Sequence, residues 1–237
     1  MGCYIRLYSR LRKKRHQFDI LHAYALSWFS LLSLPIAHGL GKAALIEVTL
    51  DGGMLDNLRS RSVNPVEMVR RWALGKADRV LTHSPYMAEL VRSAGVPVRK
   101  IVTIPNAVDI EEYCPVDDRA KWGVRQKLGM GREDRILLYV GGINQRKSVD
   151  FILEAFIHLK QPNDNLKLYL VGPTDKYDQE FIRRLEKRVS ENGFSDDVHF
   201  SRESVKNVSE YMKASDIFLF ASRNEGFGTV VIEAMSC

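Results

Sequence analysis

The sequence predicts an α/β protein with two Rossmann-like parallel-sheet domains. Short apolar runs rich in β-branched and aromatic residues alternate with helical stretches of roughly ten to eighteen residues, as in βαβ units. The runs are almost continuously apolar, for example 136–140 and 217–220, which is typical of strands buried on both faces. A composition of 45% hydrophobic and 27% charged residues excludes a disordered or collagen-like chain.

The elements follow from these runs in chain order. Helices are predicted where the apolar period lengthens, at 26–38, 148–160, 176–192 and 204–214, with a further helix that starts near Thr229. Strands are predicted at 18–24, 43–50, 79–83, 100–104, 135–141, 166–172, 198–201 and 216–221.

The segment between about 110 and 134 interrupts the alternation, because it holds proline, glycines and many charges but no apolar run. We therefore predict a partial N-terminal domain at 1–112, a linker at 113–134 and a C-terminal domain at 135–237. The first domain supplies only four strands, and the sequence stops about two turns into its last predicted helix. We expect a piece of a longer protein, with the first domain incomplete and the second cut near its C-terminal end.

Residues 20–41 contain no charged side chain, which raises the question of a membrane span. The stretch is interrupted by His22, Pro35 and His38, and it divides into a strand and a helix. We therefore expect no transmembrane segment and no cleavable signal.

No metal site and no cofactor are predicted. The three cysteines are far apart and form no C-x-x-C pair, no two aspartates stand at i and i+2, and no two histidines fall three or four residues apart. Dinucleotide-binding, P-loop and nucleophile-elbow motifs are also missing. Since no disulfide framework is indicated, we expect a cytoplasmic protein.

The loop 222–229 follows an apolar strand and precedes a helix that carries Glu233. Ligands of parallel sheets bind beyond the carboxyl ends of strands, and glycines let the backbone approach them. The amides of Gly228 and Thr229 at the helix start suit a diphosphate, while Glu225 and Glu233 suit the hydroxyls of a sugar or ribose. The same pattern also fits an ordinary helix start with acidic residues in its first turn.

A second loop, 141–147, joins the strand at 135–141 to its helix. Its two glycines are followed by adjacent cations, Arg146 and Lys147, and this combination suits a phosphate group. Taken alone, Lys147 also fits a solvated residue at a helix start, although a cation there opposes the helix dipole.

Together these motifs resemble the retaining glycosyltransferases of the GT-B type, in the group called family 4 or group 1. The loop 139–148 is similar to the family's strand and donor loop, and residues 214–222 lead into a similar E-x7-E signature at Glu225 and Glu233. Segments 19–23, 77–84 and 104–109 resemble parts of the family's first domain, so the resemblance covers nearly the whole chain.

The resemblance implies transfer of a hexose from an NDP-sugar to a hydroxyl of a glycan or lipid-linked acceptor, with retention of the anomeric configuration. The departing diphosphate oxygen helps to deprotonate the acceptor in such a reaction, so no side-chain base is needed. Gly142 stands where the family usually has arginine, and Asp51 where many members have histidine. The implied residues are Glu225 and Lys147 for catalysis, Gly142, Arg146, Lys147, Gly226, Phe227, Gly228, Thr229 and Glu233 for the donor, and His22 and Asp51 on the acceptor side.

The formal net charge of +6 arises entirely in the first half of the chain. Part of it is one run, Arg10, Arg12, Lys13, Lys14 and Arg15, which suits an anionic membrane surface at the cytoplasmic face. The same run also fits a solvated basic edge or a frayed terminus. No nucleic-acid recognition motif accompanies it, so we expect no nucleic-acid partner.

One alternative to a transferase stays open. The chain would then be a non-catalytic fragment or binding module that retains only sugar-nucleotide or membrane-surface binding.

Overall fold

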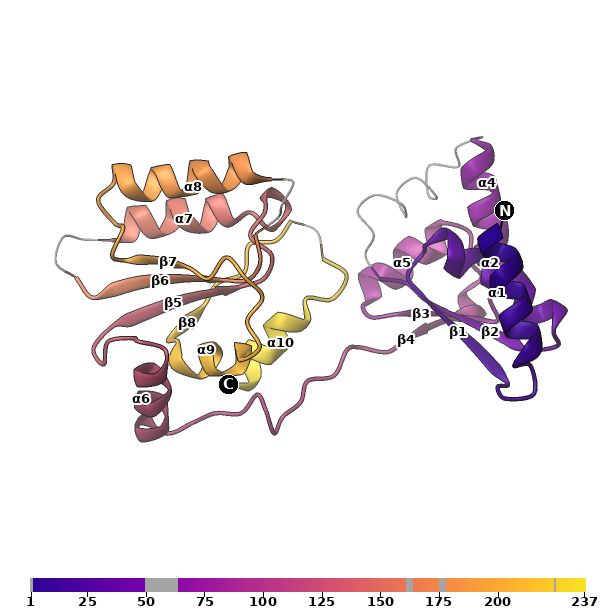
Figure 1. The fold of residues 1–237 in the computed structure, drawn as a ribbon, viewed down its shortest axis with the longest axis horizontal. Coiled ribbons are helices and arrows are strands. Elements are labelled where there is room, and N and C mark those ends of the chain that lie inside the picture. Colours follow the sequence, from indigo (N-terminus) through magenta and orange to yellow (C-terminus); the bar gives the residue numbers. More distant parts are fainter. Residues whose placement is uncertain (1, 50–63, 161–163, 175–177, 224) are drawn as a thin grey trace. The chain divides into compact units, whose positions relative to one another are not determined.

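The computed structural model describes residues 2–49, 64–160, 164–174, 178–223 and 225–237. The chain divides into two compact units, Met1–Asn106 and Ala107–Cys237, here called unit 1 and unit 2. Each unit holds a parallel four-stranded sheet with helices packed on it, so the predicted fold class is confirmed (Figure 1). All eight predicted strands are present, most of them shorter by one or two residues at an end.

In unit 1 the strands lie in sequence order, β1-β2-β3-β4, and all pairs are parallel. The four strands are β1 (Ile20–Tyr24), β2 (Ala43–Glu47), β3 (Arg79–Thr82) and β4 (Ile101–Thr103). Their buried side chains form one core with the helices. The helices are α1 (Gly2–Lys13), α2 (Trp28–Gly39), α4 (Pro65–Gly75) and α5 (Pro85–Ser93), with a 3-10 turn η1 (Val98–Lys100) before β4.

In unit 2 the order is β7-β6-β5-β8, again all parallel. The strands are β5 (Arg135–Val140), β6 (Leu166–Val171), β7 (Val198–Phe200) and β8 (Ile217–Phe218). Two separate apolar clusters, one on each face of the sheet, form the core. The first involves α7 (Val149–Leu159) and α8 (Gln179–Glu191), and the second α6 (Asp118–Lys127), α9 (Val208–Ala214) and α10 (Thr229–Ser236) (Figure 1).

Helix α6 corrects one prediction, because it lies inside the segment that the sequence predicts as a linker. The side chain of Asp117 caps this helix and accepts a hydrogen bond from the Ala120 amide at 2.7 Å. Near the other end of α6, the guanidinium of Arg125 is buried and donates to the carbonyl of Ala214 and to the carboxylate of Asp216. The helix is therefore part of unit 2.

Helix α1 is a second difference, since the first helix that the sequence predicts is 26–38. The helix runs to Lys13, and its cations Arg10, Arg12 and Lys13 occupy the last turn. Positive side chains at that end interact favourably with the helix dipole. Within the described ranges, no helix is long and apolar enough to cross a membrane.

Candidate donor site

The strand order of unit 2 creates a switch point between β5 and β8. From β5 the chain proceeds outward to β6 and β7, then returns to pair β8 on the other side of β5. The connections leaving the two neighbouring strands therefore diverge at their carboxyl ends, which is where open parallel sheets bind ligands. The two predicted donor loops, 141–147 and 222–229, are the segments that follow β5 and β8.

The first donor loop begins where the backbones of Gly141 and Gly172 pass close to each other. Gly172, at the end of β6, has φ +145°, and a Cβ there would lie 2.1 Å from the carbonyl oxygen of Gly141. Gly141 itself has φ +150°. Because the obstructing atom belongs to the backbone, only glycine fits at position 172. This contact fixes the course of the chain into the donor loop.

Residues Gln145–Lys147 form a short 3-10 turn, η2, before helix α7. The side chain of Asn144 caps this turn by accepting the Lys147 amide at 3.2 Å. Ser148 then adopts a left-handed conformation, with φ +53°, and helix α7 begins at Val149. The turn holds Lys147 close to the carboxyl edge of the sheet.

The second donor loop supplies Glu225, and the two loops meet there. Oxygen Oε1 of Glu225 accepts a hydrogen bond from the ammonium of Lys147 and another from the hydroxyl of Ser222, at 2.7 Å. The guanidinium of Arg146 lies 3.5 Å from the same oxygen. The Lys147 ammonium also lies 6.0 Å from the centre of the Phe220 ring. The structure thus brings together Arg146, Lys147 and Glu225, which are distant in sequence.

This arrangement determines the ionisation of Glu225, whose side chain is only 23% exposed. Burial raises the pKa of its carboxyl, but hydrogen bonds from Lys147 and Ser222, and the charges of Lys147 and Arg146, outweigh that effect and leave the pKa lowered. Tyr139 lies beneath the loop, and its hydroxyl donates to the carbonyl of Gly142 at 2.9 Å. Burial and the nearby Glu225 charge raise the pKa of that phenol, so it stays a donor.

Helix α10 begins directly after the second loop. Gly228 caps it with φ +78°, a conformation that favours glycine, and Thr229 is the first helical residue. Gly226 and Phe227 precede this cap and are half-buried. The start of the helix therefore lies at the switch point, where the positive end of the helix dipole suits an anionic ligand.

Glu233 lies in the second turn of α10 in a different environment from Glu225. Burial, and then the negative charge of Glu112, raise the pKa of its carboxyl. Burial, and then the charge of Glu233, raise the pKa of the phenol of Tyr113. The two glutamates of the E-x7-E signature therefore have opposite pKa shifts.

The predicted acceptor-side residues belong to unit 1. Asp51 lies outside the described residues. His22, on β1, has its Nε2 atom 3.1 Å from the Oε2 atom of Glu47, which ends β2. His83, after β3, lies 3.0 Å from the other oxygen of Glu47. Glu47 and His83 are not among the residues that the sequence predicts, and the position of each just where a strand ends is the signal that points to them.

Within the part of the chain that the structure describes, no group of three or more histidine, cysteine, aspartate or glutamate residues could hold a metal ion.

Two family models match the chain. The family of glycosyl transferases group 1 matches residues 120–237, and glycosyltransferase family 4 matches residues 2–112. D-inositol 3-phosphate glycosyltransferase from Geodermatophilus obscurus is 27% identical over 234 residues, which cover 93% of this chain and 50% of that protein. Mannosylfructose-phosphate synthase from Agrobacterium fabrum is 29% identical over 164 residues, 67% of this chain and 36% of that protein.

Among solved structures, HepE from Anabaena in complex with UDP-glucose has a TM-score of 0.78 at 20% identity, covering 98% of this chain and 61% of that chain. The chain spans about half the length of the curated relatives it matches. The two matching families together cover nearly all of the sequence, and the chain belongs to the group 1 glycosyltransferases, with the GT-B fold.

Proposed function

We propose that this chain binds an NDP-sugar in unit 2 and takes part in transfer of the hexose to an acceptor hydroxyl, with retention of the anomeric configuration. The observation that carries the proposal is the cluster of Arg146, Lys147 and Glu225 at the switch point between β5 and β8. It combines cations for a diphosphate with a carboxylate for sugar hydroxyls. The similarity to a protein solved with UDP-glucose supports the same class of donor.

Each residue has a distinct part in this proposal. Lys147, with Arg146, pairs with the donor diphosphate, and the amides of Gly228 and Thr229 at the start of α10 add hydrogen bonds to it. Gly142, Gly226 and Phe227 form the loop backbone and wall around the donor. Glu225 accepts hydrogen bonds from the sugar. Because Ser222 and Arg146 also approach Glu225, its carboxylate keeps polar partners when Lys147 turns to the diphosphate.

The proposed chemistry needs stabilisation of the leaving group more than a side-chain base. Negative charge develops on the diphosphate as the sugar departs, and preorganised cations and amides lower the energy of that state. The departing oxygen takes the proton of the acceptor hydroxyl. Glu233, one turn into α10, holds the ribose. The acceptor is a glycan or a lipid-linked glycan.

Donor binding tests this proposal on the chain itself. Isothermal titration with UDP-glucose should give measurable binding, and Lys147→Ala should weaken it about ten- to hundred-fold, the range for lost hydrogen bonds to charged groups. Lys187→Ala is the matched control, since Lys187 is a 74% exposed lysine on α8 of the same unit. Equal weakening by both changes, or none by Lys147→Ala, would refute the donor site.

We also propose that donor binding is independent of metal ions and of any cofactor. The cations of the loop, Arg146 and Lys147, then perform the charge neutralisation that a divalent ion supplies in other sugar-nucleotide enzymes. EDTA should leave the affinity for UDP-glucose unchanged. A strict requirement for Mn²⁺ or Mg²⁺ would contradict this part of the proposal.

Retention is tested by the product rather than by binding. The donor UDP-glucose has an α-anomeric linkage, so proton NMR of the product made with D-inositol 3-phosphate as a probe acceptor should show an α-linked sugar. A β-linked product would establish inversion and would leave the transferase assignment intact.

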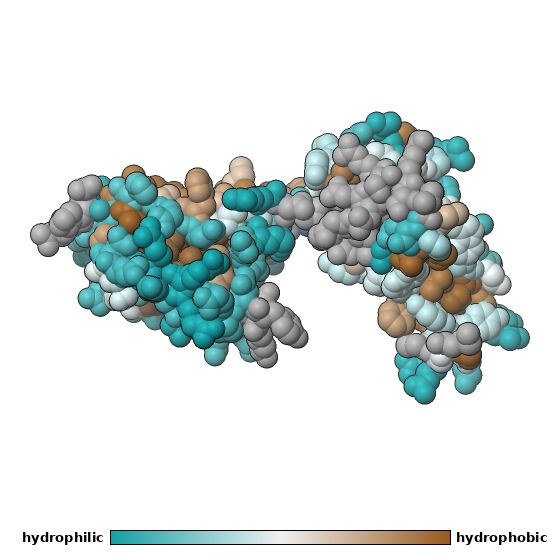
Figure 2. All heavy atoms as spheres, turned by 90° about the horizontal axis from the view of Figure 1, so that it is seen from above, coloured by the Kyte–Doolittle hydropathy of each residue, from teal (hydrophilic) through white to brown (hydrophobic). Residues whose placement is uncertain are grey.

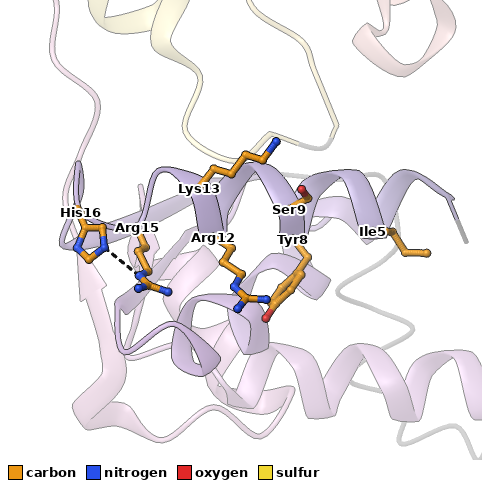
Figure 3. A pocket seen from close by; sticks show the side chains of 7 residues that line it. All are labelled: Ile5, Tyr8, Ser9, Arg12, Lys13, Arg15 and His16. Carbon is orange, nitrogen blue, oxygen red and sulfur yellow. Dashed lines mark hydrogen bonds between the residues drawn. The ribbon is translucent and has the colours of Figure 1, made fainter.

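A second proposal concerns the cytoplasmic membrane surface and rests on helix α1. Its last turn is cationic, and Ile5 and Tyr8 on the same helix are 64% and 41% exposed. Tyr8, Arg12, Arg15 and His16 are among the residues that line a hollow of about 530 Å³ beside this helix. Figure 3 shows their side chains on α1 and on the turn that follows it. Figure 2 shows further apolar side chains at the surface of unit 1. Exposed apolar and aromatic side chains among cations suit the interface of an anionic bilayer.

Vesicle binding tests the membrane proposal. Each cation near an anionic surface contributes about 1 kcal/mol, so replacing the five cations of residues 10–15 with glutamine should sharply reduce binding to phosphatidylglycerol vesicles. Added salt should have the same effect on the wild type. Equal binding to neutral and anionic vesicles would refute the proposal.

A further inference from the structure

The two carboxylate oxygens of Glu225 have different surroundings. Oε1 accepts hydrogen bonds from the Lys147 ammonium and from the Ser222 hydroxyl, and the Arg146 guanidinium lies 3.5 Å from the same atom. Oε2 makes no hydrogen bond to any residue that the structure describes. The side chain is 23% exposed, so it is open to solvent on one side. Oε2 is therefore the oxygen left for a hydroxyl of a ligand.

Ser222 follows a part of the chain that is anchored to the sheet. Strand β8 ends at Phe218, but the amide of Leu219 still donates to the carbonyl of Leu138 on β5 at 2.7 Å. Leu219 and Ala221 then pack against the apolar cluster on the face covered by α7 and α8. Ser222 comes directly after these contacts, so its hydroxyl is held by the end of the sheet.

The three groups around Oε1 differ in what a bound donor offers them. Lys147 and Arg146 are cations, and a diphosphate gives each of them a strong charge-assisted partner. The hydroxyl of Ser222 carries no net charge, and its side chain is too short to follow the cations. The hydrogen bond from Ser222 is therefore the contact to Glu225 that a bound diphosphate leaves in place.

We propose that Ser222 is a positioning residue, whose hydroxyl holds Oε1 of Glu225 so that Oε2 accepts a hydrogen bond from a hydroxyl of the donor sugar. This inference rests on the proposed transferase function. A glutamate that loses its cations to the diphosphate gains freedom about several torsions, and binding would have to remove that freedom again. A carboxylate that is already held loses less entropy when the sugar binds. Ser222 should therefore favour the sugar part of the donor and not the nucleoside diphosphate.

The ionisation of Glu225 records the same contact. Burial raises the pKa of its carboxyl, but the hydrogen bonds from Lys147 and Ser222, and the charges of Lys147 and Arg146, lower it overall. A carboxylate can only accept, so the Ser222 hydroxyl donates. Removing that hydroxyl removes one of the groups that lower the pKa. Loss of the contact can therefore be measured at Glu225 without any ligand.

Carbon NMR of the side-chain carboxyls during a pH titration tests the contact on the whole chain. Ser222→Ala should raise the pKa of Glu225, and Ser222→Thr, which keeps a hydroxyl, should leave that pKa near the wild-type value. Ser190→Ala, at an exposed serine on α8, is the matched control and should have no effect. A pKa of Glu225 that does not respond to Ser222→Ala would overturn the contact.

A comparison of two ligands tests what the contact does. UDP-glucose and UDP differ by the sugar, so Ser222→Ala should weaken UDP-glucose binding about two- to ten-fold, as for one hydrogen bond, and should leave UDP binding unchanged. Lys147→Ala should weaken the binding of both ligands, because it acts on the diphosphate. If the wild type binds both ligands and Ser222→Ala weakens both equally, or neither, the positioning role alone fails. If the wild type binds neither ligand, the donor site and the positioning role fail together.

A double-mutant cycle separates an effect through Glu225 from an effect on the whole loop. In the Glu225→Ala background no carboxylate is left to hold, so adding Ser222→Ala should not weaken UDP-glucose binding further. Ser222→Thr in the wild-type background should restore most of the affinity that Ser222→Ala loses. Additive losses in the double variant would show that Ser222 acts independently of Glu225, and would overturn the proposal.

Discussion

Two glutamates eight residues apart experience opposite electrostatic environments. For Glu225, burial raises the pKa, but Lys147, Ser222 and Arg146 together lower it. For Glu233, burial and Glu112 both raise it. Carboxylates whose charged form destabilises the folded state are common at functional sites, because the residues there serve binding rather than stability. Replacing each glutamate with glutamine should therefore have different effects on stability and on kinetics.

The pH dependence of stability is the first prediction. A lowered pKa means that Glu225 stabilises the fold above its ordinary pKa, and that this contribution is lost as pH falls through the folded value. Glu225→Gln should cost about 1 kcal/mol at pH 7, and the difference should narrow in acid.

The contribution of Glu233 to stability should depend on pH in the opposite direction. Its raised pKa means that the charged form destabilises the fold at neutral pH, and that this penalty disappears as pH falls below the ordinary value of a glutamate. Glu233→Gln should therefore be neutral or stabilising by a few tenths of a kcal/mol at pH 7. Urea unfolding of both variants between pH 4 and 7 measures these differences, and parallel curves for the two variants would contradict the assigned environments.

Kinetics give the second prediction. If Glu225 binds the transferring sugar, Glu225→Gln should lower kcat by about ten- to hundred-fold, because a charge-assisted hydrogen bond costs roughly 1.5–3 kcal/mol. If Glu233 binds the ribose, Glu233→Gln should mainly raise the donor KM. Glu191→Gln, at the end of α8, is the control and should leave both constants unchanged. Wild-type turnover from both site variants would rule out the donor assignment.

Among individual residues, the sequence predicts the donor site of unit 2, but it does not predict that Glu47 and His83 lie together in unit 1. Lys147 and Glu225 each follow a predicted strand of one sheet, so the strand-end rule predicts that they lie close together. Glu47 and His83 also end or follow strands, but neither stands in one of the two predicted donor loops. Their proximity depends on the pairing of β2 with β1 and β3, which apolar patterning does not specify.

At the scale of elements, the crossing of Gly141 and Gly172 determines the position of the donor loop. Gly172→Ala should destabilise the protein by about 3 kcal/mol, because its Cβ would displace the backbone of Gly141. UDP-glucose binding should be lost with it. Gly123→Ala, inside α6 where a Cβ meets nothing within 4 Å, should instead stabilise by roughly 0.5–1 kcal/mol. Thermal unfolding of the two variants checks both values, and a harmless Gly172→Ala would refute the role of the crossing.

An ion pair between buried Arg125 and partly exposed Asp216 connects α6 to the sheet. Arg125 is 5% exposed and donates to three carbonyls, of Ala214, Arg132 and Asp134, as well as to Asp216. Asp216 also accepts the amide of Ile136 at 2.7 Å. Burial raises the pKa of Asp216, but Lys121, that amide and Arg125 lower it overall.

Asp216→Asn should therefore cost about 1–2 kcal/mol at neutral pH, since it removes the counter-charge of the buried guanidinium, while solvent screens the partly exposed carboxylate. The lowered pKa means that the contribution of Asp216 is lost as pH falls through its folded value, so the difference from the wild type should shrink in acid. Denaturant unfolding at several pH values measures this, with Glu191→Gln as a surface control. An unchanged unfolding midpoint at pH 7 would show that α6 is held by other contacts.

The composition of helix α6 explains why the sequence predicts a linker in its place. Its glycine, its charges and the preceding proline resemble a linker, and its apolar face is short because Arg125 occupies a buried position. The Asp117 cap was a usable signal of a helix start. Helix α1 was missed for a related reason, since a run of cations obscured its helical period.

At the scale of the whole molecule, two units each have their own parallel sheet and core. The sequence predicts this architecture well, because strands buried on both faces must be almost entirely apolar. It does not predict the order β7-β6-β5-β8, since every parallel order has the same apolar pattern. That order places the switch point between β5 and β8, and so it identifies the donor loops among the connections of unit 2.

Amide chemical-shift mapping of the labelled 237-residue chain during titration with UDP-glucose tests the central claim most directly. We expect saturable shifts confined to the donor loops, residues 141–147 and 222–229, and to the first turns of α10, which Lys147→Ala abolishes and Lys187→Ala preserves. Shifts that appear in unit 1 alone, or that persist unchanged in Lys147→Ala, would contradict a donor site at the switch point of the second sheet.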